Sequence, residues 1–212
     1  MKYYIFLSVL ALAALAVLAA SPATANIIYA TQDAFINQTQ PDTVQGAGIT
    51  VKGQSSYRRI GFLEYAFGDI AVTEATLHMY HVAKWSDPTY RVDFRGGEAT
   101  WDESAITWNT GVPEGSGQWP VIGQWTAGAA GLWYTLDITD FYNDNLGKSM
   151  TFRLSSPDGG ANQGGSYEDR LGGRGSGNPH YISFTPVPEP SSLLALASGF
   201  VGLAGVAIRR RR

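Results

Sequence analysis

Two long apolar segments at the chain ends leave only the middle of this sequence free to fold as a globular domain. Residues 5–20 contain a single polar side chain, Ser8, and residues 191–208 contain no charged side chain. Segments this apolar favour a membrane or a buried helix over the surface of a soluble domain. The body between them, residues 26–186, is long enough for one domain with its own core and too short for two.

The N-terminal segment has the three parts of a secretory signal peptide. Lys2 precedes the apolar run, and small residues stand at positions 23 and 25. We therefore predict that residues 1–25 are a signal peptide that signal peptidase cleaves after Ala25. A core helix or a membrane anchor is the alternative, and it is disfavoured because the run is short and a cleavage pattern follows it at once.

The C-terminal segment is typical of a single transmembrane helix. As an α-helix, residues 191–208 would be about 27 Å long, close to the hydrocarbon thickness of a bilayer. Four arginines follow at 209–212 and would remain on the cytoplasmic side. Prolines at positions 186, 188 and 190 predict a stiff, extended spacer before the helix. The body is therefore predicted to lie outside the membrane.

The last 26 residues also resemble a known processing signal. The run from Val187 to Ser191 reads Val-Pro-Glu-Pro-Ser, and the apolar helix and the arginine cluster follow it in order. Residues 187–212 in this way resemble the PEP-CTERM sorting signal. The resemblance implies a Gram-negative bacterium that makes exopolysaccharide, and an inner-membrane exosortase that cuts near Pro188, Glu189 and Pro190. The mature protein would then reach the cell surface or the extracellular matrix of a biofilm. A permanent membrane anchor is the alternative.

The body is acidic and contains no cysteine. Residues 26–186 hold 17 acidic and 10 basic side chains, although the formal charge of the whole chain is only −3. An acidic body argues against nucleic acid as a partner, since phosphate binding needs a basic face. It also disfavours an anionic membrane surface. An exported chain without disulfides must be stabilised by its core, with or without a bound ion.

Short β-rich runs separated by turn residues fill the body, which is typical of an antiparallel β-sandwich. Leu77, Met79 and His81 should share one face of a strand, and His78 and Tyr80 the other. Residues 139–146 are predicted to be helical, with a cap at their first residue and a stop at position 147. Residues 158–177, with eight glycines, are predicted to be one long loop. The predicted strands are 27–30, 34–37, 49–52, 59–65, 75–84, 90–95, 106–108, 121–125, 132–138, 150–155 and 181–184.

Several motifs in the body, taken in order, resemble the DNRLRE family. The resemblance implies an all-β, antiparallel jelly-roll β-sandwich over residues 26–186 that acts as a carbohydrate-binding module. The sequence departs from the family at residues 63–65, where Leu-Glu-Tyr replaces the common Phe-Asp-Leu, and in its long glycine-rich loop. The motifs lie at residues 33–36, 57–65, 75–80, 100–109, 166–170 and 179–182.

Tryptophan rings are the first candidates for a sugar site, because their flat apolar faces stack on the C–H face of a pyranose. Trp101 and Trp108 bracket a family-wide motif and are expected in the core. Trp85 and Trp119 lie beside predicted turns and are expected to be exposed. These two rings are therefore ligand-binding candidates, with ordinary core packing as the alternative for each.

Arginines are the second group of ligand candidates, because a guanidinium group matches a carboxylate such as that of a uronic acid. Arg58, Arg59, Arg91 and Arg95 qualify, with pairing to the surplus acidic residues as the alternative. Arg95 is the arginine we select as a ligand-binding candidate, together with Tyr90 at the start of the same predicted strand.

The sequence offers candidates for one metal site and none for a catalytic site. Asp33 and Glu168 are the preferred candidates for a structural calcium ion, because the terminal strands of a jelly roll lie close together. His78 and His81 do not form a metal pair, since residues three apart on a strand face opposite ways. No nucleophile motif, phosphate loop or convincing acid and base pair is visible, so the chain is predicted not to be an enzyme.

The leading hypothesis is an exported, non-catalytic protein of the cell surface or extracellular matrix that binds polysaccharide. Signal peptidase, an exosortase and the inner membrane would be its processing partners. One alternative is a structural or adhesion protein of the matrix without a sugar site. Another is a polysaccharide-degrading enzyme, since fold does not determine function.

Overall fold

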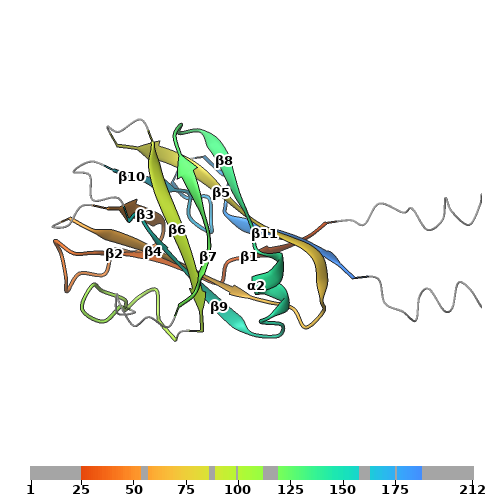
Figure 1. Ribbon diagram of the computed structural model, residues 1–212. Coiled ribbons are helices and arrows are strands. Elements are labelled where there is room, and N and C mark those ends of the chain that lie inside the picture. The colour runs from red at the N-terminus through yellow and green to blue at the C-terminus, as the bar shows by residue number, and fades with distance from the viewer. Residues whose placement is uncertain are drawn as a thin grey trace, which may run out of the picture.

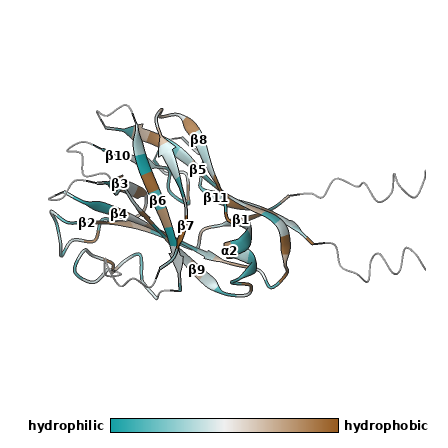
Figure 2. Ribbon diagram, viewed as in Figure 1, coloured by the Kyte–Doolittle hydropathy of each residue, from teal (hydrophilic) through white to brown (hydrophobic). Residues whose placement is uncertain are grey.

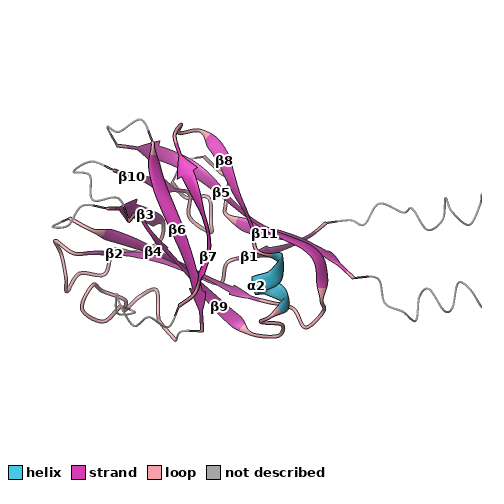
Figure 3. Cartoon of the chain, in the orientation of Figure 1, coloured by secondary structure: helices cyan, strands magenta, loops and turns pink. Residues whose placement is uncertain are grey.

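The regular structure of the described residues is almost all β-strand, with one short helix beside the strands (Figures 1 and 3). This computed structural model describes residues 25–53, 57–85, 89–98, 100–111, 119–157, 163–174 and 176–187. The all-β prediction is confirmed, and the jelly-roll topology stays a prediction. The strands are β1 (Asn26–Tyr29), β2 (Gln32–Asn37), β3 (Ile49–Lys52), β4 (Arg59–Ala66), β5 (Val72–Lys84), β6 (Tyr90–Gly97), β7 (Val121–Ala127), β8 (Leu132–Asp137), β9 (Ser149–Ser155), β10 (Gly164–Tyr167) and β11 (Tyr181–Pro186).

All strand pairs are antiparallel, and together they form one strongly curled sheet with two halves. In the first half β5 pairs with β8 on one side and with β11 and β10 on the other, while β1 extends β11 and β3 extends β10. In the second half the strands follow the order β2, β4, β9, β6, β7. The halves join where Lys52 at the end of β3 pairs with Arg59 at the start of β4.

The main hydrophobic core lies between the two halves. Along β5 the inward residues Leu77, Met79 and His81 are fully buried, and the alternating residues His78 and Tyr80 are half-buried on the outer face. This period of two is the predicted one, and it is confirmed. The same alternation runs along β6, where Figure 2 shows hydrophilic and hydrophobic bands in turn. Burying one face of each strand is the main source of stability for such a sheet.

A second, smaller core lies under the loop of residues 100–111. Trp101 and Trp108 pack there against buried residues of β2 and β4, including Ile36, Ile60 and Phe62. The indole N–H of Trp101 donates a hydrogen bond to a threonine hydroxyl on β9, 3.0 Å away. Both tryptophans therefore have the packing role that the sequence predicted.

The strand predicted at residues 106–108 is wrong, because this segment forms turns. The carboxylate of Asp102 accepts hydrogen bonds from the N–H and the hydroxyl of Ser104, at 2.8 and 2.7 Å. The N–H of Ile106 donates to the carbonyl of Asp102, and the hydroxyls of Thr107 and Thr110 lie 3.0 Å apart. Local hydrogen bonds from aspartate, serine and threonine stabilise turns at the expense of strands.

The glycine-rich segment predicted as one loop contains strand β10, which is a second correction. Residues 164–167 pair with β3 on one side and β5 on the other. A side chain on Gly165 would overlap the hydroxyl of Tyr90 and the ring of His81. Glycine is therefore required in this strand by the buried side chains beside it, a constraint that composition alone does not reveal.

The single described helix, α2, runs over Thr139–Asn143 and is shorter than predicted. Thr139 does not cap it. Asp137 instead accepts hydrogen bonds from the N–H and the hydroxyl of Thr139, at 2.9 and 2.6 Å. The Thr139 hydroxyl also accepts the N–H of Ala75 at 3.0 Å, which ties the helix start to β5. Turn residues follow up to Gly147, whose φ of 71° ends the segment as predicted.

Both ends of the described chain lie at the same end of the domain. Asn26 of β1 pairs with Phe184 of β11, and the end of β3, the start of β4 and the end of β5 lie at the opposite end (Figure 1). Ala25 is exposed. The predicted helix at 191–208 and the Pro188, Glu189 and Pro190 cleavage region lie outside the described residues. Within the described ranges, no helix has the length and hydrophobicity to cross a membrane.

Candidate functional site

Three basic side chains and two aromatic rings gather where the two halves of the sheet join. Lys52 and Arg59 face each other across the hairpin from β3 to β4, and Tyr57 lies in the turn between them. Trp85 follows the last residue of β5, and Arg174 comes from the loop after β10. Five residues from distant parts of the sequence thus form one surface site, which we name the basic-aromatic cluster.

The cations of the cluster lie over its rings. The Lys52 ammonium is 5.2 Å from the ring centroid of Tyr57 and 5.5 Å from that of Trp85. The Arg59 guanidinium carbon is also 5.5 Å from the Trp85 ring. These separations are typical of cation–π contacts, which hold a charged group in place without using its N–H donors.

Phe35 of β2 forms the floor of the cluster. Its ring is 8% exposed, and the guanidinium carbons of Arg59 and Arg174 lie 5.8 and 5.9 Å from its centroid. Burial lowers the pKa of Arg59, and the charge of Arg174 lowers it further. An arginine remains protonated at neutral pH even so. The site therefore keeps two guanidinium charges close together in a partly desolvated position.

The charges of the cluster have no carboxylate partner within the described part of the chain. No ion pair there involves Lys52, Arg59 or Arg174, and no side-chain hydrogen bond there involves Lys52 or Arg59. The guanidinium group of Arg174 donates one weak hydrogen bond, to a threonine hydroxyl 3.4 Å away. Lysine offers three N–H donors and arginine five. An anion entering the cluster would meet these donors already positioned.

The four predicted ligand-binding residues fall into three different environments. Trp85 belongs to the basic-aromatic cluster. Arg95 and Trp119 meet elsewhere, with the guanidinium group donating to the Trp119 carbonyl at 3.0 Å. Trp119 is only 7% exposed and its ring packs against Gly97, contrary to the expected exposure. The structure thus brings Arg95 to Trp119 but does not unite them with Trp85.

Tyr90 lies in the core rather than on the surface. Its side chain is 2% exposed, and its hydroxyl lies 2.9 Å from Nε2 of His81 and 3.1 Å from the hydroxyl of Tyr167. The indole N–H of Trp125 donates to the same Tyr167 hydroxyl at 3.1 Å. Burial raises the pKa of Tyr90 far above its usual value, so it remains a neutral member of a buried polar chain. A sugar ring has no access to it.

The other arginine candidates also separate. Arg91 forms an ion pair with Asp93, with 2.9 Å between Nε and Oδ1. For Arg91 the structure therefore has the alternative named from sequence, which was pairing with an acidic residue. Arg58 is next to Arg59 in sequence and its backbone N–H donates to a glutamine side chain. Of the four arginines considered from sequence, Arg59 is the one that the structure places in the basic-aromatic cluster.

Asp33, the first calcium candidate, is instead held by basic groups of the protein. It is fully buried, and its Oδ2 accepts the Arg170 backbone N–H at 3.0 Å and lies 3.3 Å from Nε2 of His180. The Arg170 side chain forms an ion pair with Asp33 and another with Glu103, at 3.6 and 3.1 Å. The other His180 nitrogen is 2.7 Å from the hydroxyl of Tyr65. The Arg170 guanidinium group beside Asp33 opposes the binding of a metal cation here.

Glu168, the second calcium candidate, sits in a cage of hydrogen-bond donors. Its oxygens accept the backbone N–H groups of Asp169, Arg174 and Ser176, and also the Ser176 hydroxyl. Calcium needs six to eight oxygen ligands, and N–H groups cannot supply them. The described residues contain no group of three side chains suited to a metal ion. The residues present therefore do not fit the calcium site predicted from sequence.

The Glu168 cage predicts a pH-dependent stability. Burial raises the pKa of Glu168, but the hydrogen bonds from Ser176, Arg174 and Asp169 outweigh it, so the pKa lies below its usual value of 4.5. A lowered carboxylate pKa stabilises the fold above the unfolded-state pKa, and this stabilisation is lost as pH falls through the folded-state pKa. Glu168→Gln should lower the free energy of unfolding by about 2 kcal/mol at pH 7.

Chemical denaturation at pH 7 and again well below pH 4.5 measures this effect. The difference between wild type and Glu168→Gln should shrink at the lower pH, because the wild-type carboxylate is then protonated. Glu74→Gln, at an exposed position of β5, is the control and should change stability at neither pH. A Glu168→Gln loss of the same size at both pH values would contradict the role of the carboxylate charge.

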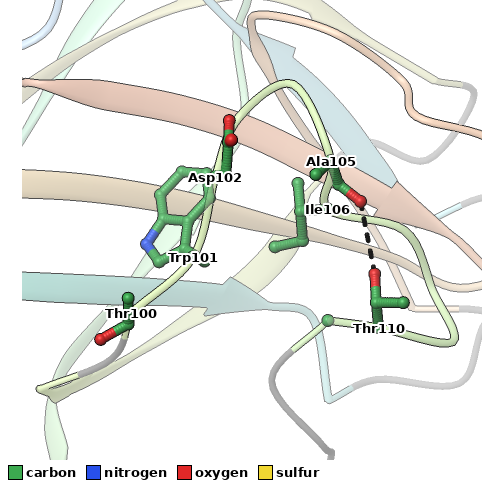
Figure 4. A pocket seen from close by; sticks show the side chains of 7 residues that line it. Thr100, Trp101, Asp102, Ala105, Ile106 and Thr110 are labelled. Atoms are coloured by element: carbon green, nitrogen blue, oxygen red, sulfur yellow. Dashed lines mark hydrogen bonds between the residues drawn. The ribbon is translucent and has the colours of Figure 1, made fainter.

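A shallow groove lies beside the loop of residues 100–111. Its volume is about 430 Å³. Figure 4 shows the Trp101 ring and the Ile106 side chain along one side, with Thr110 donating to the carbonyl of Ala105 at 3.4 Å. It is lined by Thr100, Trp101, Asp102, Ala105, Ile106, Thr110 and Gly111. Asp102 is the one charged group in this lining, so the groove has no charge that would attract an anion.

Sequence reasoning missed Lys52, Tyr57 and Arg174 as members of the basic-aromatic cluster. The hairpin signal was available, since two predicted strands, 49–52 and 59–65, flank a short turn with Tyr57 in it. The register that sets Lys52 opposite Arg59 follows from pairing, which single-sequence patterns do not specify. Arg174 reaches the cluster through a long connection, and nothing in its local sequence indicates that contact.

Two family models match the chain, one over its body and one over its C-terminal segment. Residues 24–169 match the model described as carbohydrate-binding module family 96, which spans more than half of the chain and includes Lys52, Tyr57, Arg59 and Trp85. Residues 186–212 match the model of the PEP-CTERM protein-sorting motif. Both resemblances noted from sequence are thereby confirmed. A search of the curated proteins found no match.

Proposed function

The chain belongs to carbohydrate-binding module family 96, and from this premise we propose that it is a non-catalytic module that binds acidic polysaccharide through the basic-aromatic cluster. The observation that carries the proposal is the set of positive charges, on Lys52, Arg59 and Arg174, without carboxylate partners among the described residues. A polysaccharide that contains uronic acids would supply those partners.

The cluster has separate groups for the two parts of a uronate. Guanidinium and ammonium groups form strong, charge-assisted hydrogen bonds with carboxylates. Trp85 orients Lys52 and Arg59 by cation–π contact, and Tyr57, which is 51% exposed, leaves a ring free to stack on the sugar. The acidic body repels polyanions at long range, so a concentrated local positive charge is what recognition of an acidic polymer requires.

The position of the cluster suits a protein that is displayed from a membrane. Pro186, where the PEP-CTERM match begins, pairs with Val72 at one end of β5, and Trp85 follows the other end. Thirteen extended residues place the two ends roughly 40 Å apart. In the precursor that we propose, exported and anchored through its C-terminus, the cluster would face away from the membrane. Exosortase cleavage would then deliver the jelly-roll domain, residues 26–186, to the cell surface or matrix.

Native affinity electrophoresis tests the proposed function. The full-length chain, kept soluble by a detergent without sugar headgroups, should migrate more slowly in gels that contain a polyuronate such as alginate or polygalacturonate. Trp85→Ala should reduce the retardation, since Lys52 and Arg59 lose the ring that positions them. Unchanged migration of the wild-type chain across acidic polysaccharides would overturn the proposal.

Gly48 provides an independent test of the cluster, because it lets the Arg174 guanidinium lie against the backbone. A Cβ atom at Gly48 would overlap that guanidinium group, and the residue has a φ of 105°. Gly48→Ala should therefore displace the Arg174 guanidinium group. We expect polyuronate binding to weaken by roughly fivefold, because one charge-assisted hydrogen bond to the ligand is partly lost. Affinity electrophoresis at several polymer concentrations measures the change.

Gly46 is the matched control for this substitution. It also has a positive φ, 74°, but nothing lies within 4 Å of a Cβ atom built on it. Gly46→Ala thus also introduces backbone strain, about 1 kcal/mol, without touching Arg174. It should leave binding unchanged. Equal losses of binding in Gly46→Ala and Gly48→Ala would mean that strain, and not the position of Arg174, is responsible.

A further inference from the structure

A row of aromatic rings covers the outer face of the first half of the sheet, away from the basic-aromatic cluster. Its members, which we name the aromatic strip, come from four neighbouring strands. Tyr29 of β1 pairs with Tyr181 of β11, which pairs with His78 of β5, and Tyr80 of β5 pairs with Trp133 of β8. Strand register thus sets these side chains side by side.

The rings of the aromatic strip contact one another continuously. Tyr181 stacks on His78, with centroids 4.5 Å apart and planes 12° apart. Trp133 meets Tyr181 at 5.5 Å and Tyr80 at 5.4 Å, both edge to face. Tyr29 meets Tyr181 at 6.4 Å. Mutual contact already holds the rings in place, so their side chains would lose little conformational entropy when a ligand binds.

The strip is open to solvent although it is made of large rings. Tyr29 is 54% exposed and Trp133 is 40% exposed. A contiguous exposed aromatic patch on a folded domain usually marks a surface that binds a ligand or another molecule. Hydroxyl groups lie within it, because Ser183 contacts the His78 ring at 2.8 Å and Thr135 pairs with His78 and is exposed.

The charge of the strip selects the class of ligand. None of its five residues is cationic at neutral pH, since burial lowers the pKa of His78 below its usual 6.5. Asp137, on the same face of β8 as Trp133, is acidic. An anionic polymer would gain nothing here, whereas an uncharged sugar chain offers C–H faces to the rings and hydroxyls to Ser183 and Thr135.

We infer that the aromatic strip is a second glycan-binding surface, which takes an uncharged polysaccharide. Aromatic rings that present flat faces stack on pyranose C–H groups, and nearby hydroxyls can exchange hydrogen bonds with the sugar. This site is separate from the basic-aromatic cluster. It would bind through uncharged rings and hydroxyl groups, whereas the cluster would bind through positive charges. A chain with both surfaces could cross-link an acidic and a neutral polymer, which neither site could do alone.

Native affinity electrophoresis of the full-length chain with neutral polymers tests this inference. The probes are hydroxyethylcellulose, galactomannan and laminarin, with the detergent free of sugar headgroups. We expect retardation by at least one polymer, and a loss of affinity of roughly tenfold in Trp133→Ala. Tyr29→Ser, at an exposed position of the terminal strand β1, is the second variant and should also weaken binding without risk to the core.

Arg59→Gln separates this site from the proposed function. It should leave retardation by the neutral polymers unchanged, while Trp133→Ala should leave polyuronate binding unchanged. The inference is overturned by any of three results: no retardation by the three neutral polymers, retardation that persists in both strip variants, or a change of oligomeric state in Trp133→Ala by sedimentation velocity. The last result would show that the strip contacts a second copy of the chain.

Discussion

Replacing Arg59 with glutamine is expected to weaken polyuronate binding by roughly 10- to 100-fold. The Arg59 guanidinium is half-buried between Trp85 and Phe35, so a carboxylate that meets it there is poorly screened by water. None of its side-chain N–H groups donates a hydrogen bond to the described part of the protein, so none of that part competes with the ligand for them. Isothermal titration calorimetry with an oligouronate measures the loss.

Lys148→Gln is the matched control for Arg59→Gln, because it removes the same net charge from another part of the surface. Lys148 lies 2.6 Å from Glu98 in an exposed ion pair. Its loss should change oligouronate affinity by less than about twofold, through long-range charge alone. Thermal unfolding of both variants verifies that they fold. Equal losses of affinity in the two variants would mean that binding depends on net charge rather than on the cluster.

Replacing Asp33 with asparagine is expected to lower the free energy of unfolding by about 3 kcal/mol. Asp33 is fully buried, forms an ion pair with the Arg170 side chain and lies 3.3 Å from Nε2 of His180. Asparagine keeps the shape but removes the charge, which leaves the Arg170 side chain with Glu103 as its one remaining carboxylate partner among the described residues. Burial, together with the charge of Asp33, raises the pKa of Tyr65, whose hydroxyl lies 2.7 Å from His180.

Urea denaturation at pH 7 measures the Asp33→Asn effect. Glu98→Gln is the control, because its carboxylate is 62% exposed in its pair with Lys148, and such pairs contribute less than about 1 kcal/mol. Addition of calcium or of a chelator should leave both values unchanged, since Asp33 is occupied by protein donors. An Asp33→Asn loss as small as that of Glu98→Gln, or a stabilisation by calcium that Asp33→Asn abolishes, would contradict this role.

Strand positions followed from the sequence where hydrophobic alternation was strong. The alternation along β5 placed Leu77, Met79 and His81 on one face of the strand, and the structure buries that face. The errors came where another interaction outweighed the pattern. Asp102 and Thr107 form local hydrogen bonds that turn the segment at 106–108, and the buried ring of His81 requires Gly165 in a strand that composition indicated as a loop.

The candidate site was only partly predictable. Trp85 was selected because it precedes a turn, and it lies in the basic-aromatic cluster. Tyr90 was selected at the start of a strand, where an aromatic residue is as common in the core as on a surface, and it lies in the core. Arg174 joins the cluster through tertiary packing against Phe35, which no local pattern encodes. The period of two already placed Tyr80 on the same face of its strand as His78, but the register that completes the aromatic strip was not visible.

The most direct test of the central claim compares one oligouronate with the same oligosaccharide after its carboxyl groups have been reduced to alcohols. Both are titrated calorimetrically into the full-length chain under the same conditions. If the basic-aromatic cluster recognises an acidic polysaccharide, the carboxylated form should bind at least tenfold more tightly, and Arg59→Gln should remove most of that preference. Equal affinity for the two forms, or a preference that Arg59→Gln leaves intact, would contradict the account.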